Sequence, residues 1–231
     1  MKQLKKCGMI HAPTRNQYKA ETYTEEEVLK LLELSRGTYF ELPIALSAIC
    51  GLRRGECLGI RMEDIDFDAR TLTIQRQLTL VDNNVAVGKP KTENSNRRVA
   101  LPDEVWDILS RQIKRNETIK AQLGSEYHDD GWIVCNTDGR MINPTYFTKN
   151  FSNFLIRHQM RPIRYHDLRH TCASLMLQED VDLKVTSSIL GHSTIAITAD
   201  LYTHVSDETK RNAVNQLGKL VFGAKKIDAD K

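Results

Sequence analysis

Apolar residues recur at helical spacing over the first part of the chain. In the segment YTEEEVLKLLEL, Thr24 and Glu27 form a capping-box pair ahead of an apolar run, which predicts a helix beginning there. The next apolar segment, ELPIALSAICG, predicts a second helix that ends by Gly51. A third helix is predicted from about Arg53 to about Arg61.

The pattern then changes from helical spacing to alternation of apolar and polar residues. The run RTLTIQRQLTLV alternates and is rich in β-branched residues, which is typical of a strand. VAVGKPK and RRVAL predict two more strands, separated from their neighbours by the polar turns DNN and TENSN. Residues 70 to 101 are therefore predicted to form a three-stranded antiparallel meander.

Helical spacing returns after Pro102, and the segment GWIVCN favours a short strand before the next helix. Asn143 and Pro144 are predicted to begin another helix. Four short helices are expected around residues 166–178, 183–190, 195–203 and 206–220. The fold class is thus α+β, mostly helical with one small three-stranded antiparallel sheet.

The chain divides into three parts by its patterning. Residues 1–22 are polar and basic, and we expect a flexible arm or linker remnant. Residues 23–205 form the main domain, and residues 206–231 form a C-terminal helix and tail. An apolar stripe runs along the last helix: Ala213, Val214, Leu217, Leu220 and Val221. It must be covered, either by its own domain or by a neighbouring protein molecule.

The amino-acid composition excludes some classes of protein but does not identify one. The net charge of +3 is too small to indicate a polyanionic partner by itself. Five scattered cysteines with no Cys-x-x-Cys pair argue against a disulfide framework and a cysteine-based zinc site, and favour a reducing compartment. No segment is apolar for the roughly 18 residues of a membrane span, so no membrane association is expected.

The segment HDLRH contains the first candidate site residues. His166 and His170 have the i, i+4 spacing that can bind zinc. However, the segment lacks the glutamate of HExxH, and Arg169 would repel a cation. Arg169 and His166 share a helix face and suit a phosphate oxygen. A solvated basic helix start remains the alternative.

Two further segments contain candidate residues. In GLRRGECLG, Glu56 lies three residues after Arg53 and can hold its guanidinium, although a surface ion pair would look the same in sequence. Arg53 and Arg54 would point about 100° apart on a helix, so only one is expected to face a site. In LGHSTIAITADLYTHV, His192 is followed ten residues later by Tyr202.

The order of these segments resembles the tyrosine recombinase family of phage-type integrases. GLRRGECLGIRMEDID is similar to the first arginine box of that family, and KPKTENSNRRVALP to its β-hairpin lysine segment. HDLRHTCASLML and LGHSTIAITADLYTHV are similar to its second box. The resemblance covers residues 23 to 210, which are therefore expected to contain a catalytic domain.

The resemblance implies cleavage and rejoining of DNA through a 3′-phosphotyrosine, with neither a metal nor a cofactor. It assigns the nucleophile to Tyr202, phosphate binding to the arginines, the general acid to Lys91, and a hydrogen bond to phosphate to His192. His166 is implied as base or positioning group. The predicted catalytic residues are Arg53, Lys91, His166, Arg169, His192 and Tyr202. The supporting residues are Glu56 and His170, and the predicted DNA contacts are Arg54, Lys89 and Arg97.

The resemblance also implies partners and a source. Double-stranded DNA is the expected partner, with a homotetramer on DNA and a monomer when free. The chain looks like the catalytic domain, without the N-terminal DNA-binding domain of the family. We expect a cytoplasmic bacterial protein that joins the nucleoid on DNA, from a phage or an integrative mobile element. Two other classes of protein fit the sequence less well. A DNA-binding regulator without chemistry would lack Tyr202 or an arginine, and the HDLRH and LGHS segments favour a recombinase over a relaxing topoisomerase.

Overall fold

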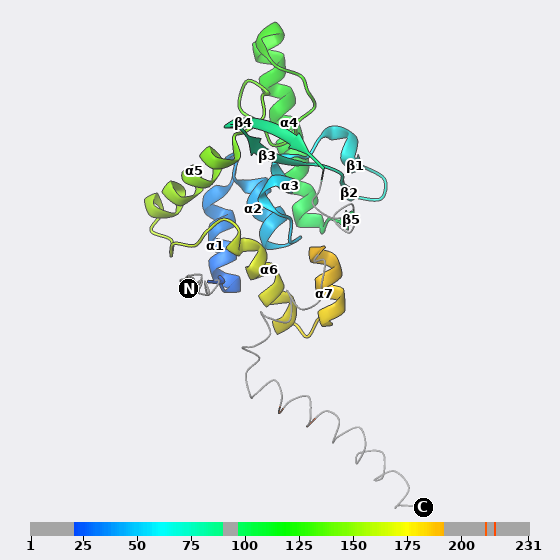
Figure 1. Cartoon of the computed structure of the whole chain (residues 1–231), viewed down its shortest axis with the longest axis vertical. Helices are drawn as coiled ribbons and strands as arrows, with labels where there is room; N and C mark the ends of the chain where they lie inside the picture. Colours follow the sequence, from blue (N-terminus) through cyan, green and yellow to red (C-terminus); the bar gives the residue numbers. More distant parts are fainter. Residues whose placement is uncertain (1–20, 90–96, 192–210, 212–214, 216–231) are drawn as a thin grey trace, which may run out of the picture.

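The computed structural model describes residues 21–89, 97–191, 211 and 215 (Figure 1). Its helices are α1 (Glu25–Ser35), α2 (Glu41–Ala48), α3 (Arg54–Leu58), α4 (Asp103–Leu123), α5 (Pro144–Arg157), α6 (Asp167–Gln178) and α7 (Leu183–Leu190), with 3-10 turns η1 (Met62–Asp64) and η3 (Gly124–Glu126). Its strands are β1 (Ile65–Asp66), β2 (Thr71–Ile74), β3 (Gln77–Val81), β4 (Asn84–Gly88) and β5 (Arg97–Ala100). The predicted α+β class, mostly helical with a small antiparallel sheet, is confirmed.

Helix α2 lies at the centre of the fold, and all eight of its residues are buried. Its sequence is apolar on every side, which is typical of a core helix. Its one acidic residue, Glu41, is neutralised by Arg111 at 2.5 Å and accepts from the Gly37 amide at 2.7 Å. Helices α1, α3, α4 and α6 pack against α2, so the segments that carry the arginine and histidine motifs share one core.

The predicted helix ends are mostly confirmed. Thr24 and Glu27 form the expected capping box of α1. Asn143 caps α5 by accepting from two backbone amides, with Pro144 in the first turn. Helices α6 and α7 agree with the predicted ranges 166–178 and 183–190.

The predicted meander is wrong in its strands. The three-stranded sheet has the order β1-β2-β5, with Leu72 opposite both Ile65 and Val99. The segment 70–81 is two strands instead of one, because β3 leaves this sheet and pairs only with β4 in a separate hairpin. Strand β1, only two residues long, was not predicted.

The break between β2 and β3 has a physical reason at Arg76. Continued alternation would turn this arginine toward the core, where a guanidinium needs a partner. Instead the chain leaves the strand, and Arg76 pairs with Asp64 and Glu63, each at 2.6 Å. The Gln75 amide also donates to Asp64, at 3.1 Å. The acidic residues in MEDID therefore decide where the strand ends.

Helix α3 is shorter than predicted, since it covers only Arg54–Leu58, and it packs closely on β3. A Cβ atom at Gly55 would lie 2.7 Å from the carbonyl oxygen of Leu78, and one at Gly59 would lie 3.1 Å from Cα of Gln77. These two glycines let the β3–β4 hairpin approach the helix that follows Arg53.

Some predictions fall outside the described residues. They are the flexible arm over residues 1–20, the helices around 195–203 and 206–220, and the loop between β4 and β5. The division into 1–22, 23–205 and 206–231 stays a prediction. No helix within the described ranges is long and apolar enough to cross a membrane.

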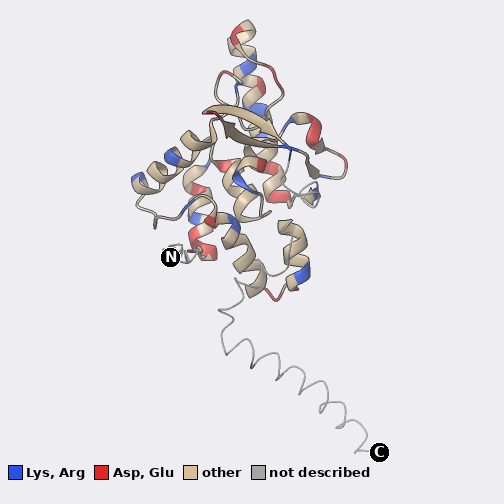
Figure 2. Cartoon of the chain, in the orientation of Figure 1, with Lys and Arg blue, Asp and Glu red and all other residues tan. Residues whose placement is uncertain are grey.

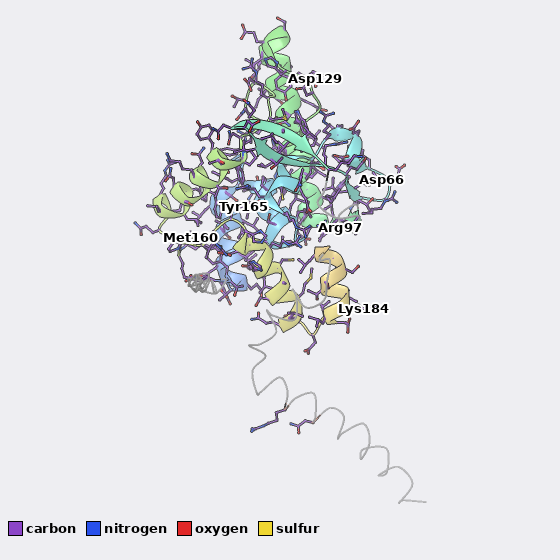
Figure 3. The ribbon with its side chains drawn as sticks, viewed as in Figure 1. Asp66, Arg97, Asp129, Met160, Tyr165 and Lys184 are labelled. Carbon is purple, nitrogen blue, oxygen red and sulfur yellow. The ribbon has the colours of Figure 1, made fainter. Side chains whose placement is uncertain are left out.

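Tyr165 is one of the largest fully buried side chains among the described residues, and it joins α2 to α5 (Figure 3). Its ring packs edge-on against Phe147 and Phe151, and its hydroxyl donates to the Pro43 carbonyl at 2.6 Å and accepts from Ser47 at 2.9 Å. Burial raises the pKa of this phenol well above its usual value. Tyr165 is therefore a structural residue.

We predict that Tyr165→Phe lowers the free energy of unfolding by about 1–2 kcal/mol, because the Pro43 carbonyl loses its donor in a buried site. Urea unfolding measures the difference. The matched control is Tyr146→Phe, at a side chain 66% exposed, which should change the free energy by less than about 0.5 kcal/mol. Equal stability of Tyr165→Phe and wild type would contradict the structural role.

Candidate active site

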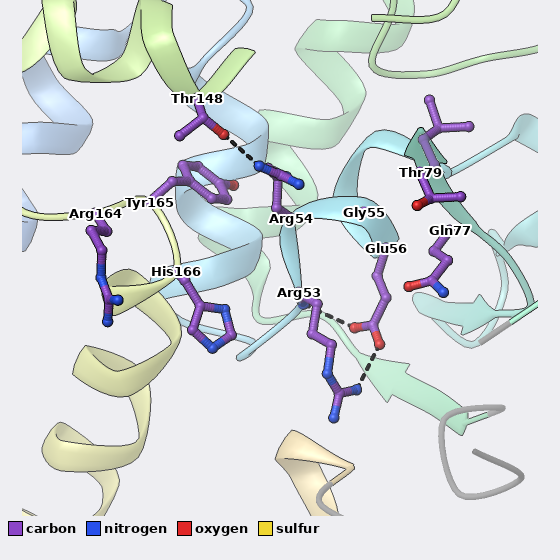
Figure 4. A pocket seen from close by; sticks show the side chains of 11 residues that line it. Arg53, Arg54, Gly55, Glu56, Gln77, Thr79, Thr148, Arg164, Tyr165 and His166 are labelled. Atoms are coloured by element: carbon purple, nitrogen blue, oxygen red, sulfur yellow. Dashed lines mark hydrogen bonds and ion pairs between the residues drawn. The ribbon is translucent and has the colours of Figure 1, made fainter. Parts of the chain in front are cut away.

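A cleft of about 700 Å³ lies between α3, the β3 strand and the start of α6 (Figure 4). The residues that line it are Arg53, Arg54, Gly55, Glu56, Gln77, Leu78, Thr79, Thr148, Arg164, Tyr165 and His166. The cleft therefore brings together the first arginine segment and the start of the HDLRH segment, which are more than 100 residues apart in sequence.

Arg53 stands at the edge of this cleft, held by a carboxylate. It is the residue before α3, in extended conformation, and its amide donates to Glu56 at 2.9 Å. Its guanidinium donates to Glu56 at 2.9 Å and to the Gly191 carbonyl at 3.0 Å. The predicted Arg53–Glu56 pair thus forms, and it is not a surface pair because the Glu56 side chain is 2% exposed.

Arg54 also lines the cleft, contrary to the expectation that only one of the two arginines faces the site. The helical angle does not apply to the pair, since Arg53 precedes the helix. The Arg54 guanidinium donates to Thr148 at 2.6 Å (Figure 4). Thr148 and Arg164 are cleft residues that the sequence did not single out, because no motif marks them. Arg164 is paired with Asp167 at 2.9 Å.

Arg169, in α6, is almost fully buried and is not among the residues that line the cleft. Its Nη1 donates to the Gly51 carbonyl at 2.6 Å. Its Nη2 has no hydrogen-bond partner among the residues that the structure describes. Burial, together with the cations of Arg53 and Arg97, lowers the pKa of Arg169 to about 9. The guanidinium therefore stays protonated at neutral pH, in a cluster of like charges.

His166 and His170 lie one helical turn apart, with ring centroids 4.9 Å from each other and rings perpendicular. His166 reaches the cleft, whereas His170 does not line it. Desolvation, then the neighbouring His170 and Arg169, lowers the pKa of His166 to about 4. Burial also lowers the pKa of His170. Both imidazoles are therefore neutral at pH 7, and His166 can accept a proton or a hydrogen bond.

The remaining predicted residues are placed as follows. Lys89 is exposed just after β4, which ends at Gly88 and is thus shorter than predicted. Arg97 is in β5, but its guanidinium is turned inward and pairs with Glu56 at 3.1 Å. Lys91, His192 and Tyr202 lie outside the described residues. In residues 21–89 and 97–191, no group of three or more His, Cys, Asp or Glu side chains could hold a metal ion.

Solved structures with the same fold are recombinases. The Tn1549 transposon integrase in complex with transposon right end DNA superposes with a TM-score of 0.74 at 20% identity, covering 88% of this chain and 68% of that chain. The XerA recombinase gives a TM-score of 0.66 at 18% identity, covering 86% of this chain and 65% of that one. The fold is thus that of a tyrosine recombinase catalytic domain.

Sequence comparison gives the family. Residues 21–209 match the phage integrase family, so the chain belongs to it. A tyrosine recombinase XerC-like protein of Caldanaerobacter subterraneus is 34% identical, covering 87% of this chain and 54% of the relative. The ICEBs1 integrase of Bacillus subtilis is 26% identical, covering 93% of this chain and 59% of the relative. The chain thus spans little more than half the length of these two curated relatives.

We predict that acid destabilises the protein through His166. Its pKa is lower in the folded chain than the 6.5 of an unfolded chain, so the unfolded state binds more protons, and stability falls as the pH drops from 6.5 toward 4. At pH 5 the full pKa shift would lower the free energy of unfolding by roughly 2 kcal/mol relative to neutral pH. The side chain is exposed to solvent at the cleft, so screening reduces this loss to roughly 1 kcal/mol.

Urea unfolding of wild type and His166→Gln at pH 7 and pH 5 measures this contribution. The variant should lose less stability between the two pH values than wild type does. An identical loss in both proteins would mean that His166 titrates normally in the folded state.

Proposed function

We propose that this chain is the catalytic domain of a site-specific recombinase, or integrase, that cleaves and rejoins DNA through a 3′-phosphotyrosine. The arginine cluster around the cleft is the observation that carries the proposal. Arg53 and Arg54 line the cleft, and Arg169 lies buried near Arg53 with an Nη2 donor that has no partner among the described residues. Planar guanidinium groups held in this way suit the non-bridging oxygens of a phosphodiester.

The nucleophile of the proposal is Tyr202. A side-chain nucleophile keeps the energy of the broken phosphodiester bond in a covalent phosphotyrosine ester, so the strand can be rejoined without an energy source. Its Oη attacks the phosphorus, the bond to the 5′-oxygen breaks, and the phenol proton passes to a base. His166 is the candidate base or positioning group, since its low pKa keeps it neutral at pH 7.

The departing 5′-oxygen needs a proton, and Lys91 is its proposed donor. In sequence, Lys91 follows by two positions the exposed Lys89, which is the residue after β4. His192 is proposed to donate a hydrogen bond to a non-bridging oxygen. It directly follows Gly191, whose carbonyl accepts from Arg53. Charge neutralisation comes from arginines in this scheme, so it uses no metal ion and no cofactor.

The proposed substrate is double-stranded DNA from a phage or an integrative mobile element, in the bacterial cytoplasm. Acidic and basic residues are both spread over the fold in Figure 2. DNA affinity is therefore expected from the cleft cations and not from the net charge of +3. Arg54 and Lys89 are the proposed backbone contacts. We further propose a free monomer and a homotetramer on DNA.

We predict that Tyr202→Phe abolishes covalent trapping on a nicked suicide substrate, because the phenyl ring has no nucleophilic oxygen. DNA binding should remain within about twofold, since no phosphate-binding cation is removed. The control is Tyr146→Phe, which removes an exposed phenol of α5 and should trap DNA like wild type. A denaturant-resistant adduct with Tyr202→Phe would overturn the assignment of the nucleophile.

An apolar groove supports the proposed assembly. It has a volume of about 380 Å³, and its lining residues are Glu25, Val28, Leu29, Leu32, Ala48, Ile49, Cys172, Leu175, Met176, Glu179 and Val181. Leu29 is 54% exposed there. We propose that the apolar stripe of residues 206–220 from a neighbouring protomer occupies this groove. The acidic rim, Glu25 and Glu179, complements the basic Lys210 and Arg211 of that segment.

We predict that Leu29→Asp prevents tetramer formation on DNA while the free chain stays a folded monomer, because a carboxylate in the groove must be desolvated on docking. Sedimentation of the chain with and without DNA measures the assembly, and circular dichroism checks the fold. Ile156→Asp is the control, because Ile156 is 71% exposed on α5 and is not part of the groove. If Leu29→Asp forms tetramers like wild type, the groove is not the docking site between protomers. The same result is expected if residues 206–220 dock on their own chain.

A further inference from the structure

Glu56 is shared by two arginines with different environments. Arg97 binds both carboxylate oxygens, with Nη1 3.3 Å from Oε1 and Nη2 3.1 Å from Oε2, whereas the Arg53 guanidinium binds Oε1 alone. The Arg97 side chain is 10% exposed and that of Arg53 is 32% exposed. Arg97 is thus the buried counter-ion of Glu56, and Arg53 is the partner that faces the cleft.

The charge balance at Glu56 depends mainly on Arg97. Burial alone would raise the pKa of this carboxyl, but the Arg97 guanidinium, followed by the amide and guanidinium of Arg53, holds the pKa below its usual value. Without Arg97, the buried carboxylate would depend on Arg53 alone. Arg53 would then be drawn into the bidentate position and away from the cleft.

Arg97 also contacts the end of α7. Its Nε donates to the Ile189 carbonyl at 3.1 Å. Gly191 has a φ of 64°, and a Cβ atom there would lie 3.1 Å from Arg97 Nη1. The left-handed backbone and the close approach of the Arg97 side chain both favour glycine at this position. One guanidinium therefore joins β5, Glu56 and the turn that leads into His192.

We propose that Arg97 is a positioning residue for strand cleavage, acting through Glu56 on Arg53 and through the end of α7 on the segment of His192. This replaces the direct DNA contact expected for Arg97 from the sequence. The inference rests on the proposed function. It assigns Arg97 no contact with the reacting phosphate, because its guanidinium is already engaged by Glu56 and Ile189.

The test is single-turnover trapping on a suicide substrate, measured over a range of protein concentrations and well below the unfolding midpoint of each variant. For Arg97→Gln we expect the cleavage rate at saturating protein to fall at least about tenfold. The protein concentration that gives half of this rate, and its dependence on salt, should stay within about twofold of wild type. Arg97→Lys should recover part of the rate, because it restores the cation without the bidentate geometry. The matched control is Arg98→Gln, which removes the same charge from the exposed face of β5 and should retain the wild-type rate at saturation.

A double-mutant cycle tests the path through Glu56. If Arg97 acts through this carboxylate, Arg97→Gln with Glu56→Gln should be little slower than the slower single variant, whereas independent effects would multiply. An unchanged cleavage rate at saturation, with a higher protein concentration at half-saturation and a weaker dependence of that concentration on salt, would indicate a phosphate contact. That result would overturn the inference. A wild-type rate for Arg97→Gln, with only a lower unfolding midpoint, would indicate a purely structural role and also overturn it. If wild type itself forms no adduct, the proposed function fails and the inference falls with it.

Discussion

The buried carboxylate of Glu56 is the constraint on which the geometry of the cleft depends. A carboxylate that is 2% exposed must be paired, and here it is paired with two arginines and one backbone amide. One partner, Arg53, directly precedes α3 and the other, Arg97, lies in β5, so the whole β3–β4 hairpin separates them in sequence. The position of each arginine is thereby set by the same acidic group. Shortening or losing that group would release Arg53 from the cleft edge.

The surrounding fold supports this pairing through close backbone packing. Gly55 and Gly59 bring β3 against α3, and Gly51 brings the end of α2 against Leu190 of α7 and offers its carbonyl to Arg169. At Gly51 an added Cβ would lie 2.5 Å from Leu190 Cδ2, and the φ of 68° favours glycine. The glycines of GLRRGECLG therefore serve the packing of the site.

The sequence predicted the helices better than the sheet. Local signals such as the Thr24 capping box and the Asn143–Pro144 start are complete within a few residues, and these helices form where predicted. The end of strand β2 depends on a contact outside the strand, because Arg76 leaves the sheet to pair with Asp64. A pattern of alternating residues does not reveal that pairing. The same limit applies to the site. The Arg53–Glu56 pair is local and was predicted, whereas the contact of Arg97 with Glu56 crosses 41 positions and was not.

Among the described residues, the cleft and its surroundings combine several arginines with two buried carboxylates, Glu56 and Asp167, and this excess of cations has a consequence for what the cleft binds. Arg53 and Arg97 both contribute to the lowered pKa of Arg169, so the guanidinium groups repel one another in the free protein. Burial of apolar residues in the common core holds them together against this repulsion, as all of α2 and most of α6 near Arg169 are buried. An anion that enters the cleft would relieve this repulsion. The free energy of folding has already oriented these charges, so a phosphodiester that gathers negative charge would meet donors in position, which is the condition for electrostatic stabilisation of a transition state.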